Sequence, residues 1–150
     1  MILDERSEFC DATALNTGGA ASYILGDVYD LGVTDPNDIA VGLGELYLVI
    51  TVDTAATSGG SATGTFSLVT DSAAGLDSTP ATIISSKAWP VAEMTAGTVL
   101  LAVRLPMEGT AYERYIGIQQ TTGTAAFTAG KINAFLTKDV SRWTAYPDAI

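Results

Sequence analysis

Short runs of β-branched and aromatic residues recur along this chain, each bounded by Gly, Pro or Thr-rich turn residues. Such runs are typical of short strands, and several of them at roughly even spacing indicate a β-sandwich or a barrel. Six runs stand out, at 45–53, 64–70, 81–86, 98–105, 112–120 and 131–138. No stretch gives a convincing long amphipathic helix, so we predict an all-β fold.

The first two runs make the clearest hairpin, because the small residues at 55–61 between them suit a flexible hairpin tip. Two later runs carry alternating apolar residues, which places these side chains on one face of each strand. We predict that the two faces meet in the core. They consist of Val99, Leu101, Val103 and Leu105 in one strand and of Ile132, Ala134 and Leu136 in the other.

The 150 residues are predicted to form one domain, long enough to bury a sizeable core without a disulfide or a metal. Residues 1–20 are expected as an N-terminal arm containing a short helix at 7–15, and residues 141–150 as a C-terminal tail. Trp89 is held extended by Pro90 and is expected to plug one end of the sandwich. Large apolar side chains in the arm and tail need a surface to dock on, within the domain or on a neighbour. The candidate partner-binding residues are Ile2, Leu3, Phe9, Trp143 and Tyr146.

Charged residues are few, and most of them are acidic. Seven Lys and Arg stand against seventeen Asp and Glu, which gives a net charge of −10. Binding to phosphate backbones needs clustered cations, so nucleic acid is not expected as a direct partner. The imbalance lies in residues 1–75, which hold eleven acids and one base, whereas residues 76–150 hold six of each. We therefore expect one surface or end of the fold to be acidic and another to be nearly neutral.

Histidine is absent and Cys10 is the single cysteine. Without histidine, neither a Ser-His-Asp triad nor a Cys-His pair can activate a nucleophile, and the usual zinc sites are also excluded. We expect no catalytic residue, no cofactor and a buried free thiol. The N-terminus lacks the pattern of a secretory signal, and the longest apolar run, 46–50, is far short of the ~20 residues of a membrane span. The chain is expected to be made in a reducing cytoplasm, with no membrane as partner.

An acidic segment at 27–38 is the best candidate for a metal site. Its four carboxylates, Asp27, Asp30, Asp35 and Asp38, offer the hard oxygen ligands that calcium prefers. Their spacing does not match an EF-hand. The end of the segment, at 35–38, also reads as a turn in which Asp and Asn side chains cap backbone amides, and we favour that structural role.

Ordered pieces of the sequence carry a family resemblance that spans nearly the whole chain. They are MILD at 1–4, YDLG at 29–32, LYLVITVDTA at 46–55, TFSL at 65–68, RYIGI at 114–118 and FTAGKINAFLT at 127–137. Through these pieces the chain resembles the capsid cement, or decoration, proteins of short-tailed double-stranded DNA phages. Each piece alone is an ordinary strand or turn pattern, and the order and spacing carry the resemblance.

The resemblance implies a jelly-roll-like antiparallel β-sandwich without enzymatic activity. It also implies a homodimer on the virion exterior that bridges neighbouring major capsid proteins and stabilises the head. Two alternatives stay open. One is a calcium-assisted carbohydrate-binding jelly roll, in which Trp89, Trp143 or exposed Tyr residues stack on sugar rings. The other is a structural adaptor of the phage tail or fibre.

Overall fold

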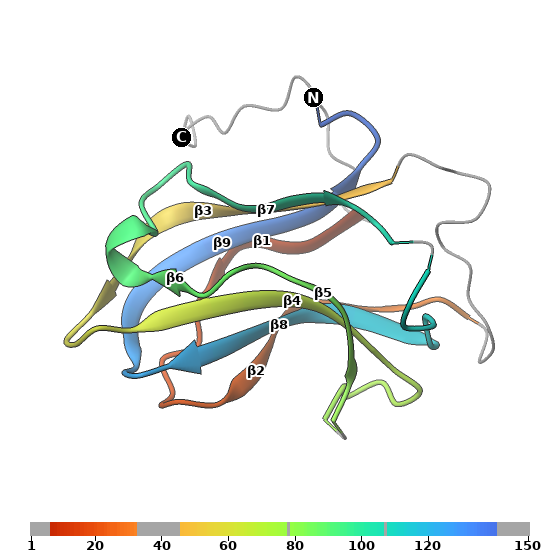
Figure 1. The fold of residues 1–150 in the computed structure, drawn as a ribbon, viewed down its shortest axis with the longest axis horizontal. Coiled ribbons are helices and arrows are strands. Elements are labelled where there is room, and N and C mark those ends of the chain that lie inside the picture. Colours follow the sequence, from red (N-terminus) through yellow and green to blue (C-terminus); the bar gives the residue numbers. More distant parts are fainter. Residues whose placement is uncertain (1–6, 33–45, 78, 107, 141–150) are drawn as a thin grey trace.

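Two antiparallel sheets packed face to face make up the computed structural model, which describes residues 7–32, 46–77, 79–106 and 108–140 (Figure 1). The all-β prediction is confirmed. Sheet A contains, in order, β1 (Glu8–Ala14), β9 (Phe127–Thr137), β3 (Tyr47–Ser58) and β7 (Val99–Arg104). Sheet B contains β2 (Ser22–Asp30), β8 (Tyr115–Gly123), β4 (Thr63–Asp71) and β5 (Ala81–Ser85), and the short β6 (Trp89–Pro90) also pairs with β4. A 3₁₀ helix, η2 (Val91–Glu93), follows β6.

Strand pairing in the sandwich is nested along the chain. β1 pairs with β9, β2 with β8, β3 with β7 and β4 with β5, all antiparallel. The chain therefore resembles one long hairpin that has been rolled up, which is the arrangement of a jelly roll. Two further pairings, β3 with β9 and β4 with β8, join the nested pairs into the two sheets.

The core lies between the sheets and is built from the alternating residues that face inward. In sheet A the inward residues of β9 oppose those of β3 across the ladder, and β4 and β8 supply the facing layer from sheet B. Fully burying one such side chain stabilises the fold by about 1.5–3 kcal/mol. The inward set includes Leu48, Ile50, Val52, Phe66, Leu68, Ile116, Ile118, Ile132, Ala134 and Leu136. The predicted inward face of β9 is thus confirmed.

The edge strands β1 and β2 close one side of the sandwich. The Tyr29 hydroxyl donates a hydrogen bond to the carbonyl oxygen of Glu8 at 2.5 Å, and the rings of Phe9 and Tyr29 lie 4.5 Å apart between centroids. The ladder between β2 and β8 is interrupted between Leu25 and Tyr29, and Gly26 in this bulge has a φ of +65°. The bulge therefore bends β2 toward β1.

The segment at 86–98 closes the opposite side, between the edge strands β5 and β7. The carbonyl oxygen of the buried Met94 accepts a hydrogen bond from Ala56 N at 2.9 Å. The Trp89 indole is half-buried against the core, donates to the carbonyl of Leu100 at 3.0 Å and lies under the Lys87 ammonium, 3.9 Å from the ring centroid. Trp89 therefore packs along this side of the sandwich, whereas we expected it at an end.

The predicted hairpin between the runs 45–53 and 64–70 is wrong, because these runs are β3 in sheet A and β4 in sheet B, and each pairs with other strands. Other sequence predictions were wrong near the edges of the sheets. The expected helix at 7–15 is strand β1, because this segment pairs with β9, so residues 8–14 belong to the sandwich and not to a loose arm. In β7, Val99 is 42% exposed and Leu100 is buried in the core, which reverses the predicted face at this end of the strand. The register shift opposite Ile50 and Thr51 explains that reversal. In the described part of the chain, no helix is long and apolar enough to cross a bilayer.

Candidate functional site

One end of the sandwich, at the left of Figure 1, is formed by four connections that contain no charged residue. They are residues 15–21 between β1 and β2, 59–62 between β3 and β4, 94–98 between η2 and β7, and 124–126 between β8 and β9. Their sequences are LNTGGAA, GGSA, MTAGT and TAA. We call this surface the uncharged end. Because small, neutral side chains have little hydration to lose, such a surface is easily buried against another protein.

Hydrogen bonds between the connections fix the uncharged end. The Ser58 hydroxyl donates to the carbonyl oxygen of Ala126 at 2.7 Å, which ties the β3–β4 connection to the β8–β9 turn. Val91 N donates to the carbonyl of Ala62 at 2.9 Å. Loops that are already ordered lose little conformational freedom on binding, so this end is suited to docking as a rigid body.

The loop at 15–21 is held by a buried amide. Gln120 is 0% exposed, and its Oε1 accepts from Asn16 N at 2.9 Å while its Nε2 donates to the carbonyl of Asn16 at 3.0 Å. The same Nε2 is 2.7 Å from the hydroxyl of Thr122. One side chain thus satisfies both backbone groups of Asn16, which anchors this loop to β8.

The other end of the sandwich carries most of the described charge. Within and beside its described connections, at 72–77, 79–80, 105–106, 108–114 and 138–140, acids outnumber bases. The acids are Glu8, Asp30, Asp71, Asp77, Glu108, Glu113 and Asp139, and the bases are Arg104, Arg114 and Lys138. Described charge is therefore concentrated at this end of the fold, and it does not follow the two halves of the chain, since residues 15–21 and 59–62 belong to the acidic half. The ion pair of Glu93 with Lys87 borders the uncharged end beside η2.

A two-point ion pair fixes the charged end. Arg114 donates from Nε to Oδ1 of Asp30 at 2.8 Å and from Nη2 to Oδ2 at 2.7 Å. The guanidinium, together with the backbone N–H of Gly32, lowers the pKa of Asp30 from 3.8 to about 2. The pair joins the end of β2 to the start of β8 and keeps the Asp30 carboxylate ionised.

The calcium candidates do not form a metal site within the described residues. Asp27 and Asp30 both lie on β2, and Asp30 is already bound by Arg114. Nowhere among the residues that the structure describes do three Asp, Glu or Cys side chains gather to hold a metal ion. Asp35 and Asp38 lie outside the described residues.

The candidate partner-binding residues fall into two groups. Phe9 is 1% exposed and packs on Tyr29 in the core, so this side chain is not available to a partner and its assignment was wrong. Its burial follows from the pairing of β1 with β9, which turns the supposed arm into a strand. Ile2, Leu3, Trp143 and Tyr146 lie outside the described residues.

The single thiol is buried and protonated. Cys10 is 2% exposed, and burial is the main cause that raises the pKa of its thiol from 9.0 to about 12. The nearby Asp27 carboxylate raises this pKa further, while a hydrogen bond with Thr13 lowers it. Because the thiolate is the reactive form, Cys10 is a poor nucleophile in the folded chain.

Residues 9–136, which carry both ends of the sandwich, match the family model Bbp16. This chain belongs to the Bbp16 family. The family is associated with phages and fits a phage structural protein. The matched residues run from β1 to the end of β9, so they take in both sheets and all four connections of the uncharged end. A comparison with curated proteins finds no match.

Sequence reasoning missed the uncharged end of this Bbp16-family fold. The signal was present, because all four connections lack Asp, Glu, Lys and Arg. Their clustering depends on the jelly-roll topology, which brings connections that lie about a hundred residues apart in the sequence to the same end of the sandwich.

Proposed function

We propose that this protein is a non-enzymatic capsid cement protein that docks on the outside of an assembled phage head through its uncharged end. The observation that carries the proposal is the concentration of charge at one end of a rigid sandwich and its absence from the four connections at the other. A neutral, ordered end suits burial against capsid protein, and an acidic end suits exposure to water. Membership of a phage-associated family supports a structural role in the virion.

Stabilisation by such a protein follows from selective binding. A protein that binds the assembled lattice and not free capsid subunits shifts the equilibrium toward the lattice. The shift is about 2.7 kcal/mol per site when the free concentration is a hundred times the dissociation constant. A homodimer that contacts two neighbouring major capsid proteins gains further, because its second contact forms at a high effective concentration. Many modest contacts thus hold the shell against the pressure of packaged DNA.

The test of this proposal adds charge at one end or the other. The triple variant A20E/S61E/A96E places three carboxylates on exposed positions of the uncharged end. The matched control A74E/T110E/A111E places three on exposed positions of the charged end and has the same net charge. We expect the first variant to bind heads that lack the cement protein at least tenfold more weakly than the wild type does, because its carboxylates must be desolvated on docking. The control should bind nearly as the wild type does.

Thermal unfolding of both variants should match that of the wild type, since all six positions are exposed. Equal binding of the two variants to heads would refute docking through the uncharged end. Mass spectrometry of purified virions tests the wider proposal. A cement protein is present in many copies per head, so absence of the chain, or its presence in only a few copies, would exclude this role and favour a tail or fibre adaptor.

A further inference from the structure

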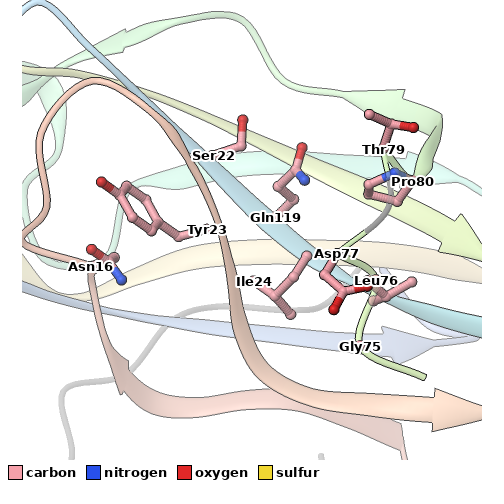
Figure 2. Close-up of a pocket in the computed structure, with 10 residues that line it drawn as sticks. All are labelled: Asn16, Ser22, Tyr23, Ile24, Gly75, Leu76, Asp77, Thr79, Pro80 and Gln119. Carbon is pink, nitrogen blue, oxygen red and sulfur yellow. The ribbon is translucent and has the colours of Figure 1, made fainter. Parts of the chain in front are cut away.

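An open pocket of about 620 Å³ lies on the outer face of sheet B, where β2 pairs with β8 (Figure 2). Four parts of the chain line it. Asn16 comes from the uncharged loop at 15–21, Ser22, Tyr23 and Ile24 come from β2, and Gln119 comes from β8. Residues 75–77, 79 and 80 close the other side. The volume is within the range of small-molecule sites, about 300–1,000 Å³. We propose that this pocket binds an uncharged saccharide.

Polar but almost uncharged groups surround the pocket. They comprise the amides of Asn16 and Gln119, the hydroxyls of Ser22 and Thr79 and the carboxylate of Asp77. Among the residues that the structure describes, no Lys or Arg lines the pocket to recognise phosphate or carboxylate groups. Sugar hydroxyls both donate and accept hydrogen bonds, which matches side-chain amides and hydroxyls that do the same.

An apolar side of the pocket completes the match to a sugar. Ile24 and Leu76 meet above Gly117, where a β-carbon would lie 2.6 Å from Cδ1 of Leu76 and 4.0 Å from Cγ2 of Ile24. The ring of Tyr23 lies beside Asn16 in Figure 2. Leu76 is 1% exposed, so the half-buried Ile24 and Tyr23 are the apolar groups that can pack against the C–H face of a pyranose, while the amides hold its hydroxyls.

The walls of the pocket are fixed before any ligand arrives. Gln120 holds both backbone groups of Asn16, and the Tyr23 hydroxyl donates to the carbonyl of Gly19 at 3.0 Å. On the opposite wall, Leu76 and Thr79 have φ values of +49° and +59°. Non-glycine residues in this left-handed region are strained, and such strain concentrates at ligand-binding sites. A fixed site loses less entropy on binding, which favours a weakly interacting ligand.

This pocket is distinct from the carbohydrate site expected from sequence. That site relied on calcium and on Trp89, Trp143 or an exposed Tyr, whereas this pocket uses the half-buried Tyr23 without a metal, and Trp89 packs between Lys87 and the carbonyl of Leu100. The pocket opens on the broad face of sheet B, and it shares only Asn16 with the four connections of the uncharged end. A head-bound copy can thus present the pocket to polysaccharide outside the virion.

Saturation-transfer NMR and calorimetry on the purified full chain test the proposal. The probes are a panel of neutral saccharides (glucose, galactose, mannose, N-acetylglucosamine and their disaccharides), with glucuronate and glucose 6-phosphate as charged counterparts. We expect binding of at least one neutral saccharide, and weaker or no binding of the charged ones. In the variant Gln119→Ala the affinity should fall about tenfold, as expected for the loss of a hydrogen-bonding partner.

Thr65→Ala is the matched control, because Thr65 is half-buried on the adjacent strand β4 and does not line the pocket. It should bind the saccharide as the wild type does. The proposal is overturned if no neutral saccharide binds at millimolar concentration, if the charged sugars bind better, or if Gln119→Ala binds as tightly as Thr65→Ala. These measurements need no phage heads, so their failure would leave head binding through the uncharged end untouched.

Discussion

The backbone of Gly26 lies directly against the carbonyl group of Phe9, so close that a β-carbon on Gly26 would overlap that oxygen. This contact sets β1 against β2 at the seam where the two sheets meet. The φ of +65° at Gly26 turns the bulge of β2 into this position. Only glycine satisfies both the space and the backbone conformation.

Replacing Gly26 with alanine should therefore open the seam. We expect Gly26→Ala to lower the free energy of unfolding by about 3 kcal/mol, through steric clash and left-handed strain together. Urea denaturation followed by circular dichroism measures the change. Gly19→Ala is the control, because a β-carbon at that position would have nothing within 4 Å, and it should shift stability by less than about 0.5 kcal/mol. Equal stability of the two variants would contradict the close contact.

The Asp30–Arg114 pair predicts a pH dependence. The folded chain lowers the pKa of Asp30 from 3.8 to about 2, so the pair stabilises the fold above the unfolded pKa and this contribution is lost as the pH falls toward 2. In Arg114→Gln, the pKa of Asp30 measured by NMR should rise toward 3.8. The stability difference from the wild type should shrink over the same pH interval. Lys131→Gln removes an exposed charge elsewhere and should leave the pKa of Asp30 in place.

The thiol of Cys10 reports on opening of the seam. Its burial and raised pKa predict that a thiol reagent at pH 8 labels the native chain only as fast as the chain opens. Labelling should accelerate with added urea, and it should be faster in Gly26→Ala, because Sγ of Cys10 lies 2.7 Å from the position of the new β-carbon. Rapid labelling of the folded wild type would show that the β1–β2 seam is open in solution.

Gln120 on β8 holds a loop of the uncharged end, and we expect its substitution to lower the stability of the fold. The change Gln120→Leu leaves the N–H and the carbonyl of Asn16 without their partner. A loss of about 2 kcal/mol in unfolding free energy is expected. Thr121→Val is the control, since its hydroxyl bonds only to the exposed Ser22 and little stability depends on it. Hydrogen exchange should show faster exchange in the loop at 15–21 of Gln120→Leu.

Local patterns predicted the central strands well and the edges poorly. The strand conformation of β3 and β4 and the inward face of β9 follow from β-branched residues and alternation, which act within each strand. Which strands pair does not follow from these patterns, since β3 and β4 are neighbours in the sequence but belong to different sheets. β1 contains Glu and Ala with Phe9 and Ala12 at helical spacing, and its strand conformation comes from pairing with β9, more than a hundred residues away. β2 contains Gly26 and two Asp residues, which favour turns, and its conformation depends on the contact with Phe9.

The same contrast explains which parts of the two candidate sites were predictable. A surplus of acid in residues 1–75 was visible, but the position of each charge required the strand order. The pocket combines Asn16 and β2 with Gln119 of β8 and with residues 75–77, 79 and 80, segments that no local pattern connects. Tertiary pairing, not local propensity, assembles these surfaces.

The nested order of strand pairing also governs when the chain can reach its native state. The innermost pair, β4 with β5, forms from neighbouring segments, whereas β1 waits for β9, the last of the described strands to be synthesised. Pairings between such distant segments make folding slow, and unpaired strand edges are prone to aggregate. β1 and β3 therefore lack their β9 partner until translation has passed Thr137, and sheet A can be completed only after that point.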